Sequence, residues 1–241
     1  MNEINQDIFV NFFHEMQNYI NTLSASSDSM GRCNAESGKI DKAGMIHHAN
    51  SIREVVELMK FHVTLVNIDT NPSFFKLQKP KTINVYDVFK RSTYIFKPRA
   101  KKNKIRFKIE SEKIPSIEII PVINIVPSII FDNCIKYSPG DSLIYIDIES
   151  DQKDISVTVQ SMGPVVYKNE IDQLKAKGFR GENAQEITSE GSGVGLHYLK
   201  TICELCNINL TISSDSNSYS INDMEYSNFK VNMVIPRNNK T

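Results

Sequence analysis

The sequence predicts an α+β protein in which an N-terminal helical hairpin forms a dimeric four-helix bundle and is followed by a two-layer α/β sandwich. Two long N-terminal stretches repeat apolar residues at steps of four and three, which is typical of helices packed lengthwise. Later segments alternate apolar and polar residues, as strands do, and these strands segregate from the helical segments. We therefore expect a helical hairpin over residues 1–70, a linker over 71–80 and the sandwich over 81–241.

Composition limits the class of protein. The chain has 241 residues and 40% hydrophobic residues, enough for one or two domains with real cores. Lys+Arg and Asp+Glu are both 28, so the net charge is zero and does not indicate a nucleic-acid partner. No apolar run is long enough to span a bilayer, and the N-terminus does not resemble a signal peptide. We therefore expect a cytoplasmic protein.

The cysteines give little sign of a metal site. Cys203 and Cys206 have the C-x-x-C spacing, but they fall within a predicted helix, and no second pair or nearby His completes a zinc site. We interpret them as reduced thiols in the core.

The first predicted helix covers residues 4 to about 30. Its apolar seam consists of Phe9, Phe13, Met16, Ile20 and Leu23. His14 lies about 100° around the helix from this seam and should face solvent. The serine-rich stretch 24–31 has low helix propensity, so the end of the helix is not fixed by the pattern.

A second helix is predicted from about Lys39 to Asn67, after a turn at 34–38. Its seam consists of Met45, Ala49, Ile52, Val56, Met59, Val63 and Val66. A single hairpin cannot cover its own seam, whereas two hairpins make a four-helix bundle, so we expect a symmetric homodimer. His47, His48 and His62 are predicted to flank the seam or face solvent.

The rest of the chain is predicted in order from periodicity and turn signals. Helices are expected over 83–96, 122–137 (with Pro127 as an irregularity) and 196–206. Strands are expected over 105–109, 116–120, 143–148, 155–159, 208–212 and 229–235, the third and fourth forming a hairpin across 151–154.

A glycine-rich stretch, Gly191-Ser-Gly-Val-Gly195, stands directly before the last predicted helix. Glycines let the backbone approach a ligand closely, and a helix that begins after them directs free N–H groups toward it. The stretch is a phosphate cradle in outline. Taken alone, it is equally well a tight loop that leads into a core helix.

Two other stretches, Phe131-Asp-Asn-Cys-Ile-Lys-Tyr-Ser-Pro139 and Gly178-Phe-Arg-Gly181, precede it. In order and spacing the three together resemble the ATP-binding domain of histidine kinases and related GHKL ATPases, from about Pro80 to Pro236. The resemblance implies a sandwich of the GHKL type, with ATP and Mg²⁺ as ligands.

The resemblance also implies roles for individual residues. Asn133 matches the family Asn that coordinates Mg²⁺ against the triphosphate, and a neutral oxygen ligand suits this ion. Lys136 lies on the same helix face and could meet a phosphate, and Tyr137 follows where the family often has an aromatic residue near the base.

The lid and the second glycine box complete the phosphate end of the implied site. Arg180 matches the family Arg that approaches phosphate or anchors the lid. Residues 182–190 are polar and non-periodic, as a mobile lid would be. Gly191, Gly193 and Gly195 match the family glycines, and Leu196 enters the core.

The adenine end departs from the family pattern. Where the family has D-x-G-x-G, this chain has Ser161-Met-Gly163-Pro-Val165. Ser161 replaces the Asp that accepts a hydrogen bond from the adenine amino group, Gly163 is retained, and Val165 replaces the second Gly. Because charge-assisted hydrogen bonds are stronger than neutral ones, weaker adenine selectivity or loss of ATP binding is expected.

A second resemblance lies in the first helix, where His14-Glu15-Met-Gln-Asn18 looks like the family's phosphoacceptor box. Phosphorylation of a histidine needs an accessible neutral ring nitrogen and a carboxylate that orients or deprotonates the other side, which Glu15 would supply. Asn18 is one helical turn away and could position a water for hydrolysis. Tyr19 replaces the usual Pro, which predicts a straighter helix.

These resemblances imply a dimeric histidine kinase core that phosphorylates His14 from ATP and passes the phosphoryl group to an aspartate of a response regulator receiver domain, with possible phosphatase activity. Because Ser161 and Val165 depart from the family pattern, an alternative is a histidine phosphotransferase that relays phosphate between receiver domains without ATP. A third class is a non-catalytic dimeric scaffold that binds a regulator.

Overall fold

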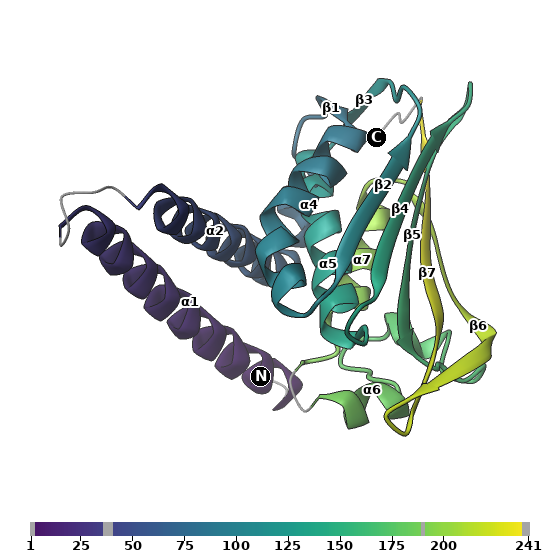
Figure 1. Cartoon of the computed structure of the whole chain (residues 1–241). Coiled ribbons are helices and arrows are strands. Elements are labelled where there is room, and N and C mark those ends of the chain that lie inside the picture. The colour runs from purple at the N-terminus through teal and green to yellow at the C-terminus, as the bar shows by residue number, and fades with distance from the viewer. Residues whose placement is uncertain (1–2, 36–40, 189–190, 238–241) are drawn as a thin grey trace. The chain divides into compact units, whose positions relative to one another are not determined.

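The computed structural model describes residues 3–35, 41–188 and 191–237 of the chain (Figure 1). The chain divides into two units, Met1–Val66 and Asn67–Thr241, and each is described by itself. In the described ranges, no helix is both long and apolar enough to cross a membrane.

The first unit is helical. It contains α1 (Glu3–Ala35) and most of α2 (Lys42–Thr70). The Asp41 carboxylate accepts a hydrogen bond from the Gly44 N–H at 3.0 Å and so caps the start of α2. The two helices meet where the Tyr19 hydroxyl lies 3.4 Å from His62 Nδ1.

α1 is longer than its pattern predicted, whereas α2 has the predicted length but begins and ends three residues later than expected. α1 continues through the serine-rich stretch to Ala35, because the low helix propensity of serine costs only a fraction of a kcal/mol per residue. The predicted turn at 34–38 therefore begins in helix, and its remainder, 36–38, lies outside the described residues.

No described residue of the predicted seam is fully buried in the single chain. Phe13 is 67% exposed and Ile20 is 48% exposed, and Val63 is also exposed. The pattern missed a second apolar stripe on α2, which the structure buries. It consists of Val55, Leu58, Phe61, Leu65 and Ile68.

The predicted linker is partly ordered. α2 extends to Thr70, and a short helix α3 (Pro72–Lys76) follows within 71–80. The helix predicted from residue 83 begins instead at Val85, because residues Lys81–Asn84 form strand β1. Asn84 ends this strand and caps the helix, since its side-chain oxygen accepts a hydrogen bond from the Asp87 N–H at 3.1 Å.

The second unit contains a five-stranded sheet in the order β2-β4-β5-β7-β6. Only the β2–β4 pair is parallel. The strands are β2 (Arg106–Ser111), β4 (Leu143–Ser150), β5 (Asp154–Pro164), β6 (Asn209–Ile221) and β7 (Met224–Pro236). A separate two-stranded sheet pairs β1 with β3 (Ser116–Ile119). The predicted β4–β5 hairpin is confirmed, whereas β6 and β7 are much longer than expected.

Helices α4, α5 and α7 lie on one face of the large sheet (Figure 1). The helical elements of this unit after α3 are α4 (Val85–Lys102), a 3₁₀ turn (Pro121–Ile125), α5 (Val126–Tyr137), a 3₁₀ turn (Gln173–Lys175), α6 (Glu182–Ile187) and α7 (Gly195–Leu205). Pro127 stands in the first turn of α5, where its missing N–H leaves no helical bond unmade. Pro127, predicted as an irregularity within one helix over 122–137, thus marks the place where the 3₁₀ turn gives way to α5.

The core lies between this sheet and these helices. Alternate residues of the central strands are almost fully buried, among them Ile144, Ile146, Ile148, Ile155, Val157, Val159, Val231, Met233 and Ile235. The Phe131 ring of α5 packs against the rings of Phe89 and Phe96 of α4. Cys203 and Cys206 are buried, as predicted for core thiols, and burial raises the pKa of each to about 12. The α+β class, a helical region followed by a mixed sheet covered by helices, is confirmed.

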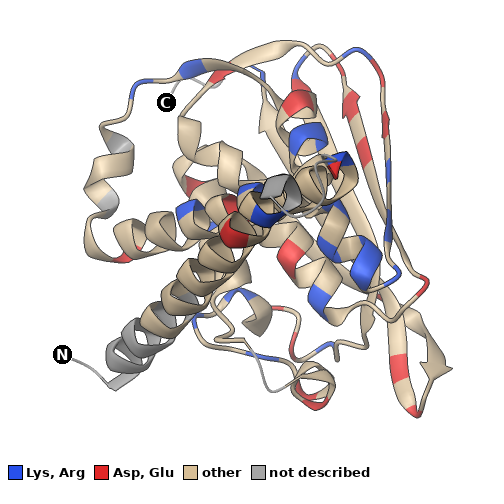
Figure 2. Ribbon diagram, turned by 60° about the vertical axis from the view of Figure 1, so that its left-hand side comes forward, with Lys and Arg blue, Asp and Glu red and all other residues tan. Residues whose placement is uncertain are grey.

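The edges of the sheet are polar. β2 presents Arg106, Lys108 and Glu110 on its exposed side, and β6 carries a register shift between Ser214 and Ser218. Basic and acidic residues are interspersed along the ribbon, and their numbers balance to a net charge of zero (Figure 2).

Candidate functional site

Helix α5 carries three of the residues that the sequence assigns to a nucleotide site. Its Phe131 and Cys134 side chains are buried, while Asn133, Lys136 and Tyr137 are partly exposed. The helix ends at Ser138, whose hydroxyl donates to the Met162 carbonyl at 2.7 Å and fixes this end of the helix to β5. This bond fixes α5 relative to β5, and with it the polar face of the helix that carries Asn133, Lys136 and Tyr137.

The glycine loop 191–195 lies directly against that face. Gly191 has φ +118°, and a Cβ at this position would lie 2.5 Å from Lys136 Nζ and 3.4 Å from the Tyr137 hydroxyl. A Cβ on Gly195 would lie 3.2 Å from the Asn133 side-chain nitrogen. These glycines therefore allow the loop to approach the polar groups of α5 more closely than any other residue could.

Gly193 joins the loop to the segment around Arg180. Its φ is +66°, and a Cβ there would lie 2.6 Å from the Phe179 carbonyl oxygen. Its own carbonyl accepts a hydrogen bond from the Gly178 N–H at 3.2 Å. Two of the stretches that the sequence singled out are thus in direct backbone contact. Leu196 follows in the first turn of α7 and is only partly buried.

Ser161 and Gly163 lie on a strand. β5 continues to Pro164, and Gly163 pairs with Ser227 of β7. Ser161 is buried, and its side chain hydrogen-bonds the thiol of Cys134 on α5. Burial raises the pKa of this thiol to about 11, and the Ser161 bond opposes part of that rise. The residue at the predicted adenine position thus faces α5 as a neutral, already paired group.

Arg180 anchors the segment that follows it. Its Nη2 donates to the carbonyls of Ala184 at 3.2 Å and Thr188 at 2.5 Å, at the C-terminal end of α6. It also hydrogen-bonds Tyr137, which lowers the pKa of that phenol against the larger upward effect of burial. The family arginine either approaches phosphate or anchors the lid, and these hydrogen bonds fit the anchoring role.

Residues 182–187 of the expected lid form the short polar helix α6, while 189–190 lie outside the described residues, and the mobility of this segment stays a prediction. Sequence reasoning missed Glu170, a buried carboxylate that accepts hydrogen bonds from the N–H groups of Glu182 and Tyr167, both at 2.9 Å. Glu170 and Arg180 therefore hold opposite ends of α6 with charges that suit the helix dipole. No apolar pattern could have indicated this helix.

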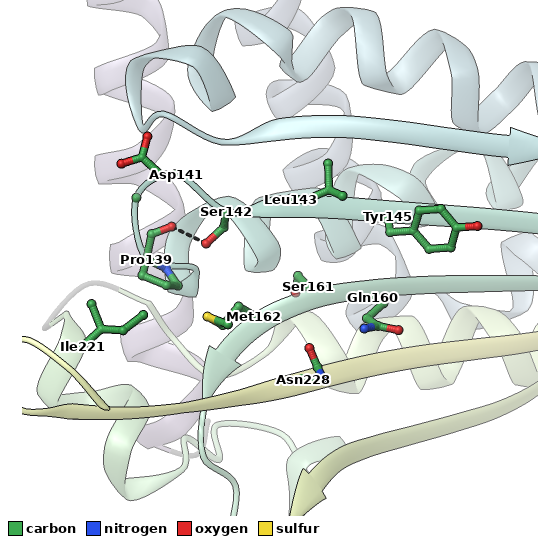
Figure 3. A pocket seen from close by; sticks show the side chains of 11 residues that line it. Pro139, Asp141, Ser142, Leu143, Tyr145, Gln160, Ser161, Met162, Ile221 and Asn228 are labelled. Carbon is green, nitrogen blue, oxygen red and sulfur yellow. Dashed lines mark hydrogen bonds between the residues drawn. The ribbon is translucent and has the colours of Figure 1, made fainter. Parts of the chain in front are cut away.

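A pocket of about 420 Å³ lies beside the strands (Figure 3). It is lined by loop 139–142 and by residues of β4, β5, β6 and β7, including Tyr145, Gln160, Ile221 and Asn228. Gln160 and Met162 flank Ser161 on β5 and, by strand alternation, face away from α5. Of the predicted site residues only Ser161 contributes to its lining, so this pocket is distinct from the place where the glycine loop meets α5.

The predicted phosphoacceptor residues lie in the first unit, on α1. His14 and Asn18 are exposed and one helical turn apart, while the Glu15 side chain is outside what the structure describes. Among the described residues no group of three or more His, Cys, Asp or Glu side chains could hold a metal ion.

Residues 123–233 match the family model described as the histidine kinase-, DNA gyrase B-, and HSP90-like ATPase. The matched range contains α5, Ser161, Arg180 and the glycine loop. The chain is also 28% identical over 88 residues to the histidine protein kinase SaeS of Staphylococcus aureus. That alignment covers 36% of this chain and spans only 25% of SaeS.

Solved structures share the fold. The Acinetobacter baumannii histidine kinase AdeS superposes with a TM-score of 0.51 at 17% identity, over 94% of this chain and 98% of the AdeS chain. The histidine kinase ThkA, solved in complex with the response regulator protein TrrA, gives a TM-score of 0.51 at 15% identity, over 98% of this chain and 62% of that one. At these identities the likeness is one of fold alone.

Proposed function

We propose that this chain is a protein-histidine kinase that transfers the γ-phosphoryl group of ATP to His14, because residues 123–233 match the histidine kinase-, DNA gyrase B-, and HSP90-like ATPase model and part of the chain is similar to a histidine protein kinase. The phosphoryl group would then pass to an aspartate of a response regulator receiver domain. ThkA, which shares the fold, was solved with a response regulator.

The observation that carries the proposal is the contact between the glycine loop and α5. Gly191 and Gly195 bring the backbone of the loop close to the side chains of Lys136 and Asn133. A cation, a neutral oxygen ligand and a glycine loop before a helix start are the groups that a magnesium-bound triphosphate needs. The residues present therefore fit the phosphate end of ATP.

Each group has a separate task in this proposal. Mg²⁺, when bound, neutralises phosphate charge, and Asn133 would supply a protein ligand to it. Lys136 binds a phosphate as a point charge, and Tyr137 shields one side of the site. Arg180 and Glu170 hold α6 in place, which would help to exclude water.

On α1, the exposed His14 ring nitrogen would attack the γ-phosphorus, so that a P–N bond forms as the bond to the β–γ bridging oxygen breaks and ADP leaves. Glu15 would accept or orient the proton on the other ring nitrogen. Asn18, one turn along, would position a water for the hydrolysis of a phosphoryl group, which supports phosphatase activity as a second reaction.

We propose that the hairpin helices pair as a homodimer, because Phe13, Ile20 and Val63 expose a seam that a second copy would cover. Multi-angle light scattering at micromolar concentration should give twice the mass of one chain. A mass of 27.4 kDa would exclude the dimer.

Nucleotide affinity and selectivity test the proposed function directly. The wild-type chain is expected to bind Mg²⁺-ATP weakly and to discriminate poorly against GTP, because Ser161 lacks the charge of the family Asp. One charge-assisted hydrogen bond contributes about 1.5–3 kcal/mol, or one to two decades in affinity. Ser161→Asp should therefore tighten ATP about tenfold or more and leave GTP unchanged in isothermal titration calorimetry.

Ser161→Ala is the matched control, since it removes the hydroxyl and adds no charge; it should not tighten ATP. If neither ATP nor ADP binds the wild-type chain at millimolar concentration, the kinase proposal fails. The phosphotransferase alternative, which the neutral and already paired Ser161 favours, would then replace it.

A further inference from the structure

One carboxylate in the second unit links the end of α2 to two segments that come much later in the sequence. Asp69, in the last turn of α2, accepts a hydrogen bond from Lys177 Nζ at 2.8 Å and another from the Tyr198 hydroxyl. Tyr198 is 129 residues further along the chain than Asp69. All three residues lie within Asn67–Thr241, so this cluster belongs to a single unit.

The two donors stand on either side of the glycine loop. Lys177 immediately precedes Gly178, whose N–H donates to the Gly193 carbonyl at 3.2 Å. Tyr198 lies in the first turn of α7, just after the loop ends at Gly195. A second link runs parallel to this one, since His197 Nδ1 lies 3.2 Å from the Lys175 carbonyl oxygen. Asp69 therefore bridges the two segments that hold the loop.

The Tyr198 side of this bridge is buried, whereas the Lys177–Asp69 ion pair lies at the surface. Tyr198 is only 1% exposed, and the side chains of Lys177 and Asp69 are 25% and 27% exposed. Burial, and then the hydrogen bond to Asp69, raises the pKa of Tyr198. The phenol therefore stays protonated and donates a hydrogen bond to the carboxylate. Without Asp69, the hydroxyl of a buried tyrosine would lose this acceptor.

We propose that Asp69 is a positioning residue for the nucleotide site: its carboxylate holds Lys177 and Tyr198 together and so sets the position of Gly191–Gly195 against α5. The proposal rests on the proposed function only in assuming that this loop binds nucleotide. The resemblance assigns Asp69, Lys177 and Tyr198 no role at the site, and their link to it runs through the backbone contacts of Gly178 and Gly193.

The experiment uses the full chain with the single changes Asp69→Asn and Tyr198→Phe and their combination. Hydrogen exchange without nucleotide reports the loop directly, and a Mg²⁺-ATP titration of autophosphorylation reports KM and the maximal rate. Each single change should speed amide exchange across residues 191–198 about tenfold, as expected for loss of a hydrogen bond to a charged group. KM should rise by a similar factor with little change in the maximal rate.

Two comparisons separate positioning from a general loss of stability. The double variant should resemble Asp69→Asn, because Tyr198→Phe acts only through its bond to Asp69, which Asp69→Asn already weakens. Glu204→Gln removes a carboxylate from an exposed pair on the same helix, where Lys200 Nζ lies 3.7 Å from Glu204, and it should alter exchange and KM less than twofold. Tyr198→Phe keeps the buried aromatic ring and should stay folded. It therefore still tests the proposal if the Asp69→Asn chain unfolds.

Unchanged exchange across 191–198 in a folded Tyr198→Phe chain, or fully additive effects in the double variant, would overturn the role of Asp69 whatever the chain does with ATP. If the variants exchange faster but the wild-type chain binds no nucleotide, the proposed function fails instead. Asp69 would then position the loop, but not for a nucleotide site.

Discussion

His14→Gln is expected to abolish the acid-labile, base-stable phosphoryl label that the chain acquires from radiolabelled ATP. Glutamine keeps the polarity and approximate size of the exposed side chain but has no ring nitrogen that can form a P–N bond. The fold should be unaffected, because an exposed polar substitution on a helix changes stability by about 0.5 kcal/mol or less. Label retention on gels at high pH, alongside circular dichroism, measures both outcomes.

His47→Gln is the matched control, since His47 is also an exposed histidine on a long helix of the hairpin. It should leave the label intact. A label that survives His14→Gln would move the phosphoacceptor to one of the histidines of α2 and contradict the assignment of His14.

Gly193→Ala is expected to lower nucleotide affinity by more than tenfold. The left-handed backbone at φ +66° costs a residue with a Cβ about 1–2 kcal/mol, and the added methyl would lie 2.6 Å from the Phe179 carbonyl oxygen and 2.8 Å from Gly178 backbone carbon. Because these neighbours are backbone atoms, the loop must move away from the segment that precedes Arg180. Calorimetry with Mg²⁺-ATP measures the loss.

Gly31→Ala is the control for the same chemical change. Gly31 lies within α1, and a Cβ there would meet no atom within 4 Å. Alanine should stabilise the helix by about 0.5–1 kcal/mol and leave nucleotide affinity unchanged. Wild-type affinity in a folded Gly193→Ala chain would show that the loop does not form the phosphate site.

The parts of the fold that the sequence predicted well are those with strong local periodicity. The strands around 143–148 and 155–159, the N-terminal half of α7 and the body of α5 all follow from apolar spacing. Short elements were missed or misplaced because their signal is not periodic. β1 spans only Lys81–Asn84, and its last residue also caps the helix that follows.

The same distinction applies to the candidate site. Asn133, Lys136 and the three glycines stand in stretches that can be recognised locally, and the structure brings them together. Glu170 could not have been found in this way, because a buried carboxylate that caps α6 looks like any other glutamate in a polar stretch. Helix α6 has no buried residue, so its polar sequence indicated a loop although its ends are held by charged side chains.

The two edge strands bear on how copies of this protein can associate. An exposed strand edge is a template for pairing with another chain, and charges or irregular backbone along the edge oppose such pairing. β2 presents Arg106, Lys108 and Glu110, and the register shift at Ser214 breaks the regular ladder of β6. Sheet-to-sheet growth into fibres is therefore disfavoured at both margins, which is compatible with the proposed closed dimer through the apolar seam of the hairpin.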